Sequence, residues 1–446
     1  MTSLERKKVL RSLSGSLKLR KGELLKTLAE ETRRSELECY TTEYLPSVAC
    51  VKWLQSSGES FFTPISLRAH THISFGYRKI IEKRIPLGTI LIITTWNYPL
   101  QITFRQVLLA LYSGNTVYLK PPQQAERTCK ILFEMFRCVS EFTDKIHLLT
   151  SDHNALEDIW SRIDGVVFTG STRIGQEISY KAAEHSIAAI IEASGYDSVI
   201  TGENIPSDSL FDHLVWALTT HSGETCIAPK ILWYKKKNAE KCKTILIEKL
   251  RAYTNEVQWK GYTNSSVSLS ITSYIDDAHR HGFADIYRNE EKVALIEAPS
   301  IEALEKVSLN ALSNGGIPFA PVLVCVPYSN FDDLKRWMSG KYVGLMVTTL
   351  GLTSRERRQA EEVSSVSVIN HNEFLTSGGI PAVALGGSGF SGIGRSGGFE
   401  YMRQLTKTQT IVTPGIFTSV SRANWSIFTK KDSIGYRFLE RMMKRG

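Results

Sequence analysis

The amino-acid sequence predicts an α/β fold in which strands and helices alternate to build a doubly wound, mostly parallel sheet. The chain has 446 residues, 42% of them hydrophobic, which is more than one hydrophobic core usually supports, so we expect two domains. Residues 89–94 form a continuous apolar, β-branched run, typical of a parallel strand buried on both faces. Strand-like and helix-like segments alternate after this run, which is the signature of an α/β sheet.

The segments can be assigned in order along the chain. Apolar side chains at three- and four-residue spacing predict helices over residues 4–68, and the alternating residues 70–77 predict an extended arm or hairpin leading to Pro86. The strands that we expect after the arm are residues 89–94, 116–119, 146–149, 165–168, 188–191, 230–234, 322–326 and 343–348. The expected helices are residues 101–113, 126–142, 174–184, 209–219 and 239–253. Residues 378–398 are glycine-rich and predict a long loop.

Charge and cysteine usage exclude several classes of protein. The net charge of +9 is spread along the chain, without zinc-finger spacing or a basic helix interleaved with aromatic residues, so we expect no nucleic-acid binding. The seven cysteines are scattered and form no CxxC pair, which predicts neither a metal site nor a disulfide framework. The N-terminus lacks the apolar segment of a secretory signal, and no apolar stretch is long enough to span a membrane. A cytoplasmic location is expected.

The stretch Phe168-Thr169-Gly170-Ser171-Thr172-Arg173-Ile174-Gly175 joins an expected strand to an expected helix. Backbone N–H groups at such a helix start can hold a pyrophosphate. The spacing differs from GxGxxG, so this motif alone would equally fit a simple turn between a strand and a helix.

Two further clusters carry residues with reactive side chains. Cys226 lies in Ser222-Gly223-Glu224-Thr225-Cys226-Ile227-Ala228-Pro229, flanked by a small polar residue. A lone cysteine is more often an inert buried residue than a nucleophile. Glu192 follows an apolar run, where burial would suit a general base, although a surface glutamate at the end of an element is the simpler interpretation.

The clusters occur in a characteristic order. TWNYP at residues 95–99, GNTVYLKP at 114–121 and FTGSTRIG at 168–175 precede Glu192 and then Cys226. This order and spacing resemble the aldehyde dehydrogenase superfamily, particularly its shorter, class 3-like members, over about residues 70–415. Together the three motifs are highly specific.

The resemblance implies a mechanism and a substrate class. Cys226 matches the cysteine whose thiolate attacks an aldehyde, and Asn97 matches the side-chain amide that holds the resulting oxyanion. Glu192 matches the base that activates water to hydrolyse the thioester. The expected product is a carboxylic acid.

The resemblance also implies a cofactor, NAD or NADP, and no metal. Its expected contacts are Lys120 and Gln123 near the adenosine ribose, Gly170, Ser171 and Gly175 near the pyrophosphate, and Thr94 and Trp96 on the ribose side. It further implies a Rossmann-like cofactor-binding domain at 1–193 with an oligomerisation arm at about 70–86, a catalytic α/β domain at 196–404, and a C-terminal arm and tail at 405–446. A homodimer is expected.

The sequence departs from the family pattern at three positions. Ile317 occupies the place of a glutamate that grips the nicotinamide ribose, a loss of roughly 1.5–3 kcal/mol of charge-assisted hydrogen bonding. Ser194 replaces a glycine near the nicotinamide. Gln123 stands where many members carry a glutamate, and its neutrality would repel a 2′-phosphate less, which favours NADP.

These departures leave two alternative interpretations open. An acyl-thioester reductase would use the same cysteine with an acyl group from coenzyme A or a carrier. A non-enzymatic scaffold would have lost catalysis through the changes at Ile317 and Ser194. The tail, residues 418–446, is charged and aromatic. If it lay on a membrane surface, it would give peripheral membrane contact, and a fatty aldehyde would be the natural substrate. More often such a tail is an ordinary helix that docks on the protein.

Overall fold

The structure is a computed structural model that describes residues 1–67, 78–152, 156–256, 261–263, 266–289, 293–313, 318–340, 343–414, 436–437, 440–441 and 444. The chain divides into two compact units, which are treated separately below. The first unit comprises Met1–Gly58 and Pro86–Thr406, and the second comprises Glu59–Ile85 and Lys407–Gly446. Ile317 and residues 70–77 lie outside the described residues, as does most of the tail from residue 418.

The first unit begins with a helical region, as expected. Its helices are α1 (Ser3–Leu19), α2 (Lys21–Thr32), α3 (Glu36–Cys39), a π-helical turn (Tyr40–Tyr44) and α4 (Leu45–Ser57). A capping box starts α1, since Thr2 accepts from the backbone of Glu5 and the Glu5 carboxylate accepts from the backbone of Thr2. The leucines of α1 and α2 that recur at helical spacing are buried. The helical pattern ends earlier than predicted, because residues 65–67 form a strand of the second unit.

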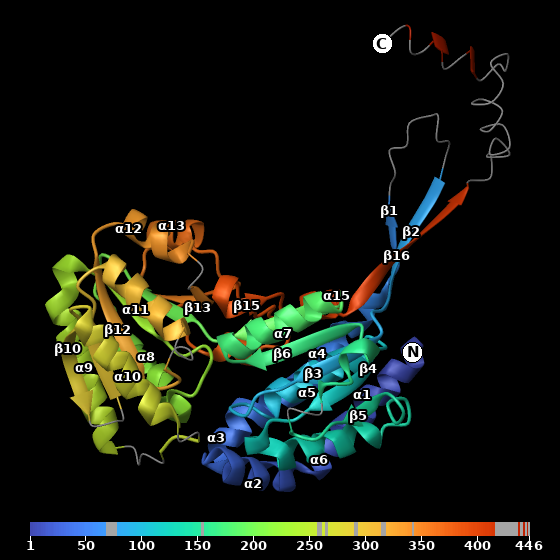
Figure 1. Cartoon of the computed structure of the whole chain (residues 1–446), viewed down its shortest axis with the longest axis horizontal. Coiled ribbons are helices and arrows are strands. Elements are labelled where there is room, and N and C mark those ends of the chain that lie inside the picture. The colour runs from blue at the N-terminus through green and yellow to red at the C-terminus, as the bar shows by residue number, and fades with distance from the viewer. Residues whose placement is uncertain are drawn as a thin grey trace. The chain divides into compact units, whose positions relative to one another are not determined.

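A six-stranded sheet follows, with the order β15-β7-β6-β3-β4-β5. Its strands are β3 (Thr89–Ile93), β4 (Thr116–Lys120), β5 (Ile146–Leu148), β6 (Gly165–Gly170), β7 (Ala188–Ala193) and β15 (Gly392–Ile393). All pairs are parallel except β15 with β7. The helices α5 (Gln101–Tyr112), α6 (Glu126–Arg137) and α7 (Thr172–Glu184) connect these strands and pack on them (Figure 1). This is the predicted doubly wound arrangement.

A seven-stranded sheet forms the rest of the first unit, with the order β10-β11-β12-β9-β8-β13-β14. Its strands are β8 (Tyr196–Thr201), β9 (Ile231–Lys235), β10 (Ala284–Asn289), β11 (Val293–Glu297), β12 (Val322–Tyr328), β13 (Val343–Leu350) and β14 (Val368–His371). Only the edge strand β10 runs antiparallel to its neighbour. Its helices are α8 (Asp208–Thr219), α9 (Ala239–Glu256), α10 (Ser266–Arg280), α11 (Ile301–Ser313), α12 (Phe331–Met338) and α13 (Ser354–Val363). Two short helices follow, α14 (Thr376–Gly379) and α15 (Gly398–Gln404).

The second unit contains a three-stranded sheet with the order β1-β2-β16. Its strands are β1 (Ile65–Leu67), β2 (Arg78–Pro86) and β16 (Thr406–Pro414). The strand β16 lies at the start of the expected C-terminal arm. Four large apolar side chains of this sheet are exposed, namely Ile65, Leu67, Ile411 and Val412. Among the described residues of the whole chain, no helix is long and apolar enough to cross a membrane.

Candidate active site

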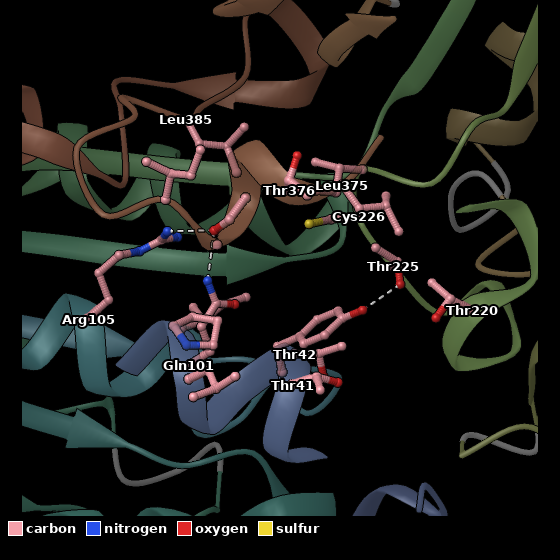
Figure 2. A pocket seen from close by; sticks show the side chains of 18 of the residues that line it. Thr41, Thr42, Gln101, Arg105, Thr220, Thr225, Cys226, Leu375, Thr376 and Leu385 are labelled. Carbon is pink, nitrogen blue, oxygen red and sulfur yellow. Dashed lines mark hydrogen bonds between the residues drawn. The ribbon is translucent and has the colours of Figure 1, made fainter. Parts of the chain in front are cut away.

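A cavity of about 440 Å³ in the first unit brings two of the predicted catalytic residues together (Figure 2). Cys226 and Glu192 both line it. Its remaining walls come from the π-helical turn and α4, from α5, from the end of α8, and from the loop between Leu375 and Leu385. Apolar side chains share these walls with five threonines and with Gln101 and Arg105 of α5.

Cys226 is positioned by a strained turn after α8. His221 and Ser222 have φ angles of 50° and 52°, and Gly223 follows with 71°, so three consecutive residues adopt the left-handed region. Such a conformation is costly for residues other than glycine and is held only by surrounding structure. A Cβ atom at Gly223 would lie 2.5 Å from the backbone nitrogen of Pro321, so the turn also packs too tightly for a side chain there. The next turn is fixed by a 2.8 Å hydrogen bond between the hydroxyls of Tyr98 and Thr225.

The electrostatic surroundings favour the neutral thiol of Cys226. Burial raises its pKa well above the usual value, and the negative charges of Glu192 and Asp197 act in the same direction. The positive charge of Arg105 opposes them but does not reverse the shift. The resting cysteine is therefore protonated near neutral pH, and it needs a base or a change of surroundings to become a nucleophile.

Glu192 lies near the end of β7 and is only 3% exposed. Its Oε2 accepts a hydrogen bond from the hydroxyl of Ser396, while Oε1 has no hydrogen-bond partner among the described residues. The interpretation of Glu192 as an exposed residue is therefore wrong. A carboxylate that is held by one oxygen and unpartnered at the other can accept a proton from a water molecule in the cavity.

Asn97 is buried beside the cysteine loop. Its Nδ2 donates to the backbone oxygen of Glu224 at 3.0 Å, and its Oδ1 accepts from Thr95 at 2.9 Å. Its own backbone oxygen accepts from Arg34 at 3.2 Å. Among the described residues, those that line the cavity do not include Asn97. The structure thus brings this amide close to the cysteine loop, and one of its two N–H groups is directed at that loop's backbone.

The predicted cofactor residues on β3 and β4 meet at one edge of the sheet. Residues Ile93 and Lys120 are paired in register, and the backbone N–H of Thr94 donates to the backbone oxygen of Lys120 at 3.3 Å. Lys120 is buried, and burial lowers its pKa. Its Nζ donates to the backbone oxygen of Ser151 at 2.9 Å. Trp96 stacks edge-on against Phe319, with ring centroids 5.8 Å apart.

The predicted pyrophosphate loop lies at the end of β6, where α7 begins. Ser171 is the N-cap of α7, and its hydroxyl accepts from the backbone of Ile174. A Cβ atom at Gly175 would lie 2.9 Å from the side chain of Ile191, so glycine allows the helix to approach the sheet closely. The carboxyl ends of parallel strands are where nucleotides bind in such sheets. Gln123 is exposed on the short turn after β4.

A model of the aldehyde dehydrogenase family matches residues 1–411. The chain belongs to the aldehyde dehydrogenase family. As a member of this family it is an oxidoreductase that converts an aldehyde to a carboxylic acid, with NAD or NADP as its cofactor. The resemblance stated from the sequence motifs is confirmed.

Individual relatives are distant but cover most of the chain. The 4,4'-diapolycopene-4,4'-dial dehydrogenase of Cytobacillus firmus is 25% identical over 370 residues, which are 79% of this chain and 78% of that protein. The 4,4'-diaponeurosporen-aldehyde dehydrogenase of Staphylococcus aureus is 24% identical over 402 residues, 87% of this chain and 85% of that protein. The substrate-bound AldH structure from Staphylococcus aureus has a TM-score of 0.79 at 19% identity, covering 98% of this chain and 94% of that chain. It shares the fold.

Several residues at the site of this aldehyde dehydrogenase were not identified from the sequence. Arg105 follows Asn97 by eight positions on α5 and lines the cavity, and Ser396 reaches Glu192 from the glycine-rich loop. The sequence carried a signal for Arg105, because an arginine interrupts the apolar pattern of residues 101–113. The sequence carried no signal for Ser396, because only the fold brings residues 192 and 396 together. Within the described part of the chain, no group of three or more His, Cys, Asp or Glu residues could hold a metal.

Proposed function

We propose that this aldehyde dehydrogenase works through a thioester on Cys226, with Glu192 as the base that hydrolyses it. The observation that supports the proposal is the shared cavity, which holds the thiol together with a buried carboxylate whose Oε1 is unpartnered among the described residues. A nucleophile and a base that face one space can act on the same carbonyl carbon.

In the first step Glu192 takes the proton of the Cys226 thiol and later releases it to solvent, the sulfur attacks the aldehyde carbon, and the carbonyl oxygen becomes an oxyanion. The second N–H of Asn97 and the backbone N–H of Cys226 are the donors that we assign to it, each worth about 3–4 kcal/mol. Loss of hydride from the tetrahedral carbon gives the thioester. Glu192 then takes a proton from water, the hydroxide attacks the thioester carbon, and the Cys226 sulfur leaves as the carboxylic acid forms.

The residues at the edge of the six-stranded sheet fit a nicotinamide dinucleotide. When bound, NAD or NADP accepts the hydride. We assign the adenosine ribose to buried Lys120 and exposed Gln123, and the pyrophosphate to the start of α7 at Gly170, Ser171 and Gly175. Thr94 and Trp96 would lie on the ribose side. Because Gln123 is neutral, we propose that NADP is accepted as well as NAD.

The alternative functions have less support. In an acyl-thioester reductase, a base beside the cysteine would destroy the acyl-enzyme by hydrolysis, and Glu192 lines the same cavity as Cys226. An inactive scaffold has no need of a protonated thiol and a carboxylate in one apolar space.

We propose the sequence-based domain division as well: a cofactor-binding domain at 1–193, a catalytic domain at 196–404 and a C-terminal arm at 405–446. The change of sheet between Ala193 and Tyr196 supports the first boundary. The exposed apolar side chains of β1 and β16 support a homodimer in which this small sheet contacts the second copy. We retain a cytoplasmic location as part of the proposal.

The test is the absorbance of NADH or NADPH formed with a panel of aldehydes. Cys226→Ala is expected to abolish the signal under both cofactors. Cys138→Ala is the matched control, because Cys138 is exposed at the end of α6 and is not among the residues that line the cavity, and it should retain full activity. Activity that survives in Cys226→Ala would contradict the thioester mechanism.

A further inference from the structure

Arg105 is a buried cation at the catalytic cavity. It lies on α5, is 4% exposed, and lines the same cavity as Cys226 (Figure 2). Glu192 lines this cavity as well. Its Nη1 donates to the backbone oxygen of Gly378 at 3.0 Å, and its Nε has no hydrogen-bond partner among the described residues. No carboxylate of the described chain forms a salt bridge with it.

Arg34 is a second buried arginine of the first unit, and unlike Arg105 it has a carboxylate as its counter-ion. Its guanidinium forms an ion pair with the buried carboxylate of Glu43, and it also donates to Thr32, Thr42 and the backbone of Asn97. A guanidinium offers five N–H donors, and a buried charge without a counter-ion is costly. Arg105 is as deeply buried as Arg34 but has no carboxylate partner among the described residues. We therefore expect a ligand to supply the anion that pairs with it.

We propose that Arg105 binds a carboxylate carried by the aldehyde substrate, at the end opposite to the reacting carbonyl. The preferred substrates are then short semialdehydes of dicarboxylic acids, which deepens the function proposed above and rests on it. A guanidinium is suited to carboxylate because two parallel N–H groups match its two oxygens. The apolar side chains of Ile102, Ile227 and Leu385 line the cavity as well and fit the methylene chain between the two polar ends.

Arg105 could instead serve as the counter-ion of the Cys226 thiolate. Its charge does favour the thiolate, but burial together with Glu192 and Asp197 outweighs it, so the thiol stays neutral at rest. The two roles predict different kinetics. A counter-ion affects every aldehyde alike, whereas a substrate anchor affects only aldehydes that carry the carboxylate.

The experiment compares kcat/KM for pairs of aldehydes matched in carbon number: succinic semialdehyde with butanal, and glutaric semialdehyde with pentanal. The wild type should prefer the semialdehyde in at least one pair. Arg105→Gln should lower kcat/KM for that semialdehyde by about 10- to 100-fold, as for loss of a charged hydrogen bond, and leave the neutral aldehyde within a few-fold. Arg105→Lys, which keeps the charge, should recover part of the loss. Arg403→Gln, an exposed arginine on α15, is the control and should change neither.

A binding measurement keeps this proposal separate from the proposed mechanism. Titration calorimetry with glutarate and with succinate should detect binding to wild type and to Cys226→Ala, and at least tenfold weaker binding to Arg105→Gln. Binding of this kind in a protein that oxidises no aldehyde would support the carboxylate site while contradicting the proposed function. Equal losses for neutral and carboxylate substrates in Arg105→Gln, or a wild type without preference for either semialdehyde, would overturn the carboxylate site.

Discussion

The hydroxyl of Ser396 donates a hydrogen bond to Oε2 of Glu192, across 204 residues of sequence. Both side chains are buried, and the Ser396 hydroxyl also lies 3.4 Å from the backbone oxygen of Leu385. The serine has a single O–H group, so while it donates to the Glu192 carboxylate it cannot donate to the backbone carbonyl of Leu385. Ser396 therefore holds Oε2 of Glu192 and leaves Oε1 without a hydrogen-bond partner among the described residues, and we treat it as a positioning residue.

Ser396→Ala should slow hydrolysis of the thioester by about tenfold, since a hydrogen bond to a charged group contributes about 1.5–3 kcal/mol. Because the carboxylate loses the donor that holds it, hydrolysis slows while acylation does not, so a larger pre-steady-state burst of NADH should accompany the slower turnover. Ser396→Thr retains the hydroxyl and should restore the wild-type burst and turnover. An unchanged burst and turnover in Ser396→Ala would show that the serine only fills space.

Glu192→Gln should make Cys226 more reactive toward iodoacetamide at neutral pH, although it should abolish turnover. The negative charge of Glu192 raises the pKa of the thiol, so its removal favours the thiolate and shifts the alkylation profile to lower pH. The rates should be measured in a Cys138→Ser background, because Cys138 is the exposed cysteine and would otherwise react first. If the midpoint of the Glu192→Gln alkylation profile lay at or above the pH of the wild-type midpoint, this electrostatic account would be contradicted.

Glu43→Ala should destabilise the protein by about 3–5 kcal/mol, because it leaves the buried Arg34 guanidinium without its counter-ion. The Glu43 carboxylate also accepts from the backbone N–H groups of Leu100 and Gln101 at the start of α5, so that helix loses its cap. Urea denaturation followed by circular dichroism measures the loss. Glu400→Ala, which breaks the exposed pair with Arg403, should cost less than about 1 kcal/mol. Comparable losses in the two variants would rule out a special role for the buried pair.

Asp197→Asn should alter how thermal stability depends on pH. Burial raises the pKa of Asp197 from 3.8 to about 8, so the folded protein holds a proton that the unfolded chain releases. This group therefore stabilises the fold at low pH, and its contribution is lost as pH rises from about 4 to about 8. Above about pH 8 the Asp197 carboxyl group is ionised in both states, so the loss stops there. Burial lowers the pKa of the neighbouring Lys230 to about 8, so above that pH the unfolded chain holds a proton that the folded protein lacks, and this group makes stability rise with pH.

The measurement is the difference in melting temperature between wild type and Asp197→Asn across that range. The melting temperature of the wild type should fall relative to that of Asp197→Asn as the pH rises. Asp332→Asn, at an exposed carboxylate in the first turn of α12, should give a constant difference. A constant difference for Asp197→Asn would show that its carboxyl group is ionised in the folded protein throughout.

The sequence was most informative where structure is local. The run at residues 89–93 is apolar on consecutive positions because β3 lies between two parallel neighbours, and this pattern is visible without a fold. The strand β10 was missed because it is an edge strand and its polar, partly exposed side chains resemble a loop. The strand β8 was missed because it starts two residues after β7, so one apolar region was assigned to one strand.

The site divided in the same way. Cys226, Glu192 and the loop at Gly170–Gly175 lie in contiguous motifs and could be named from the sequence. The residues that hydrogen-bond to the site residues are distant from them in sequence and meet them only in the folded chain. Ser396 donates to Glu192, and Arg34 donates to the backbone oxygen of Asn97. The pairing of Tyr98 with Thr225, 127 residues apart, belongs to the same class.

The short link between β7 and β8 has a mechanical consequence. Only Ser194 and Gly195 separate a strand of the six-stranded sheet from a strand of the seven-stranded one, and a side chain on Gly195 would collide with Gly344 and Ser391. The link is therefore short and closely packed, and Glu192 lies two residues before it on β7. A change in the angle between the two sheets has to bend the backbone at these two residues, so a side chain added at Gly195 is expected to displace the catalytic base as well as to disturb the packing against Gly344 and Ser391.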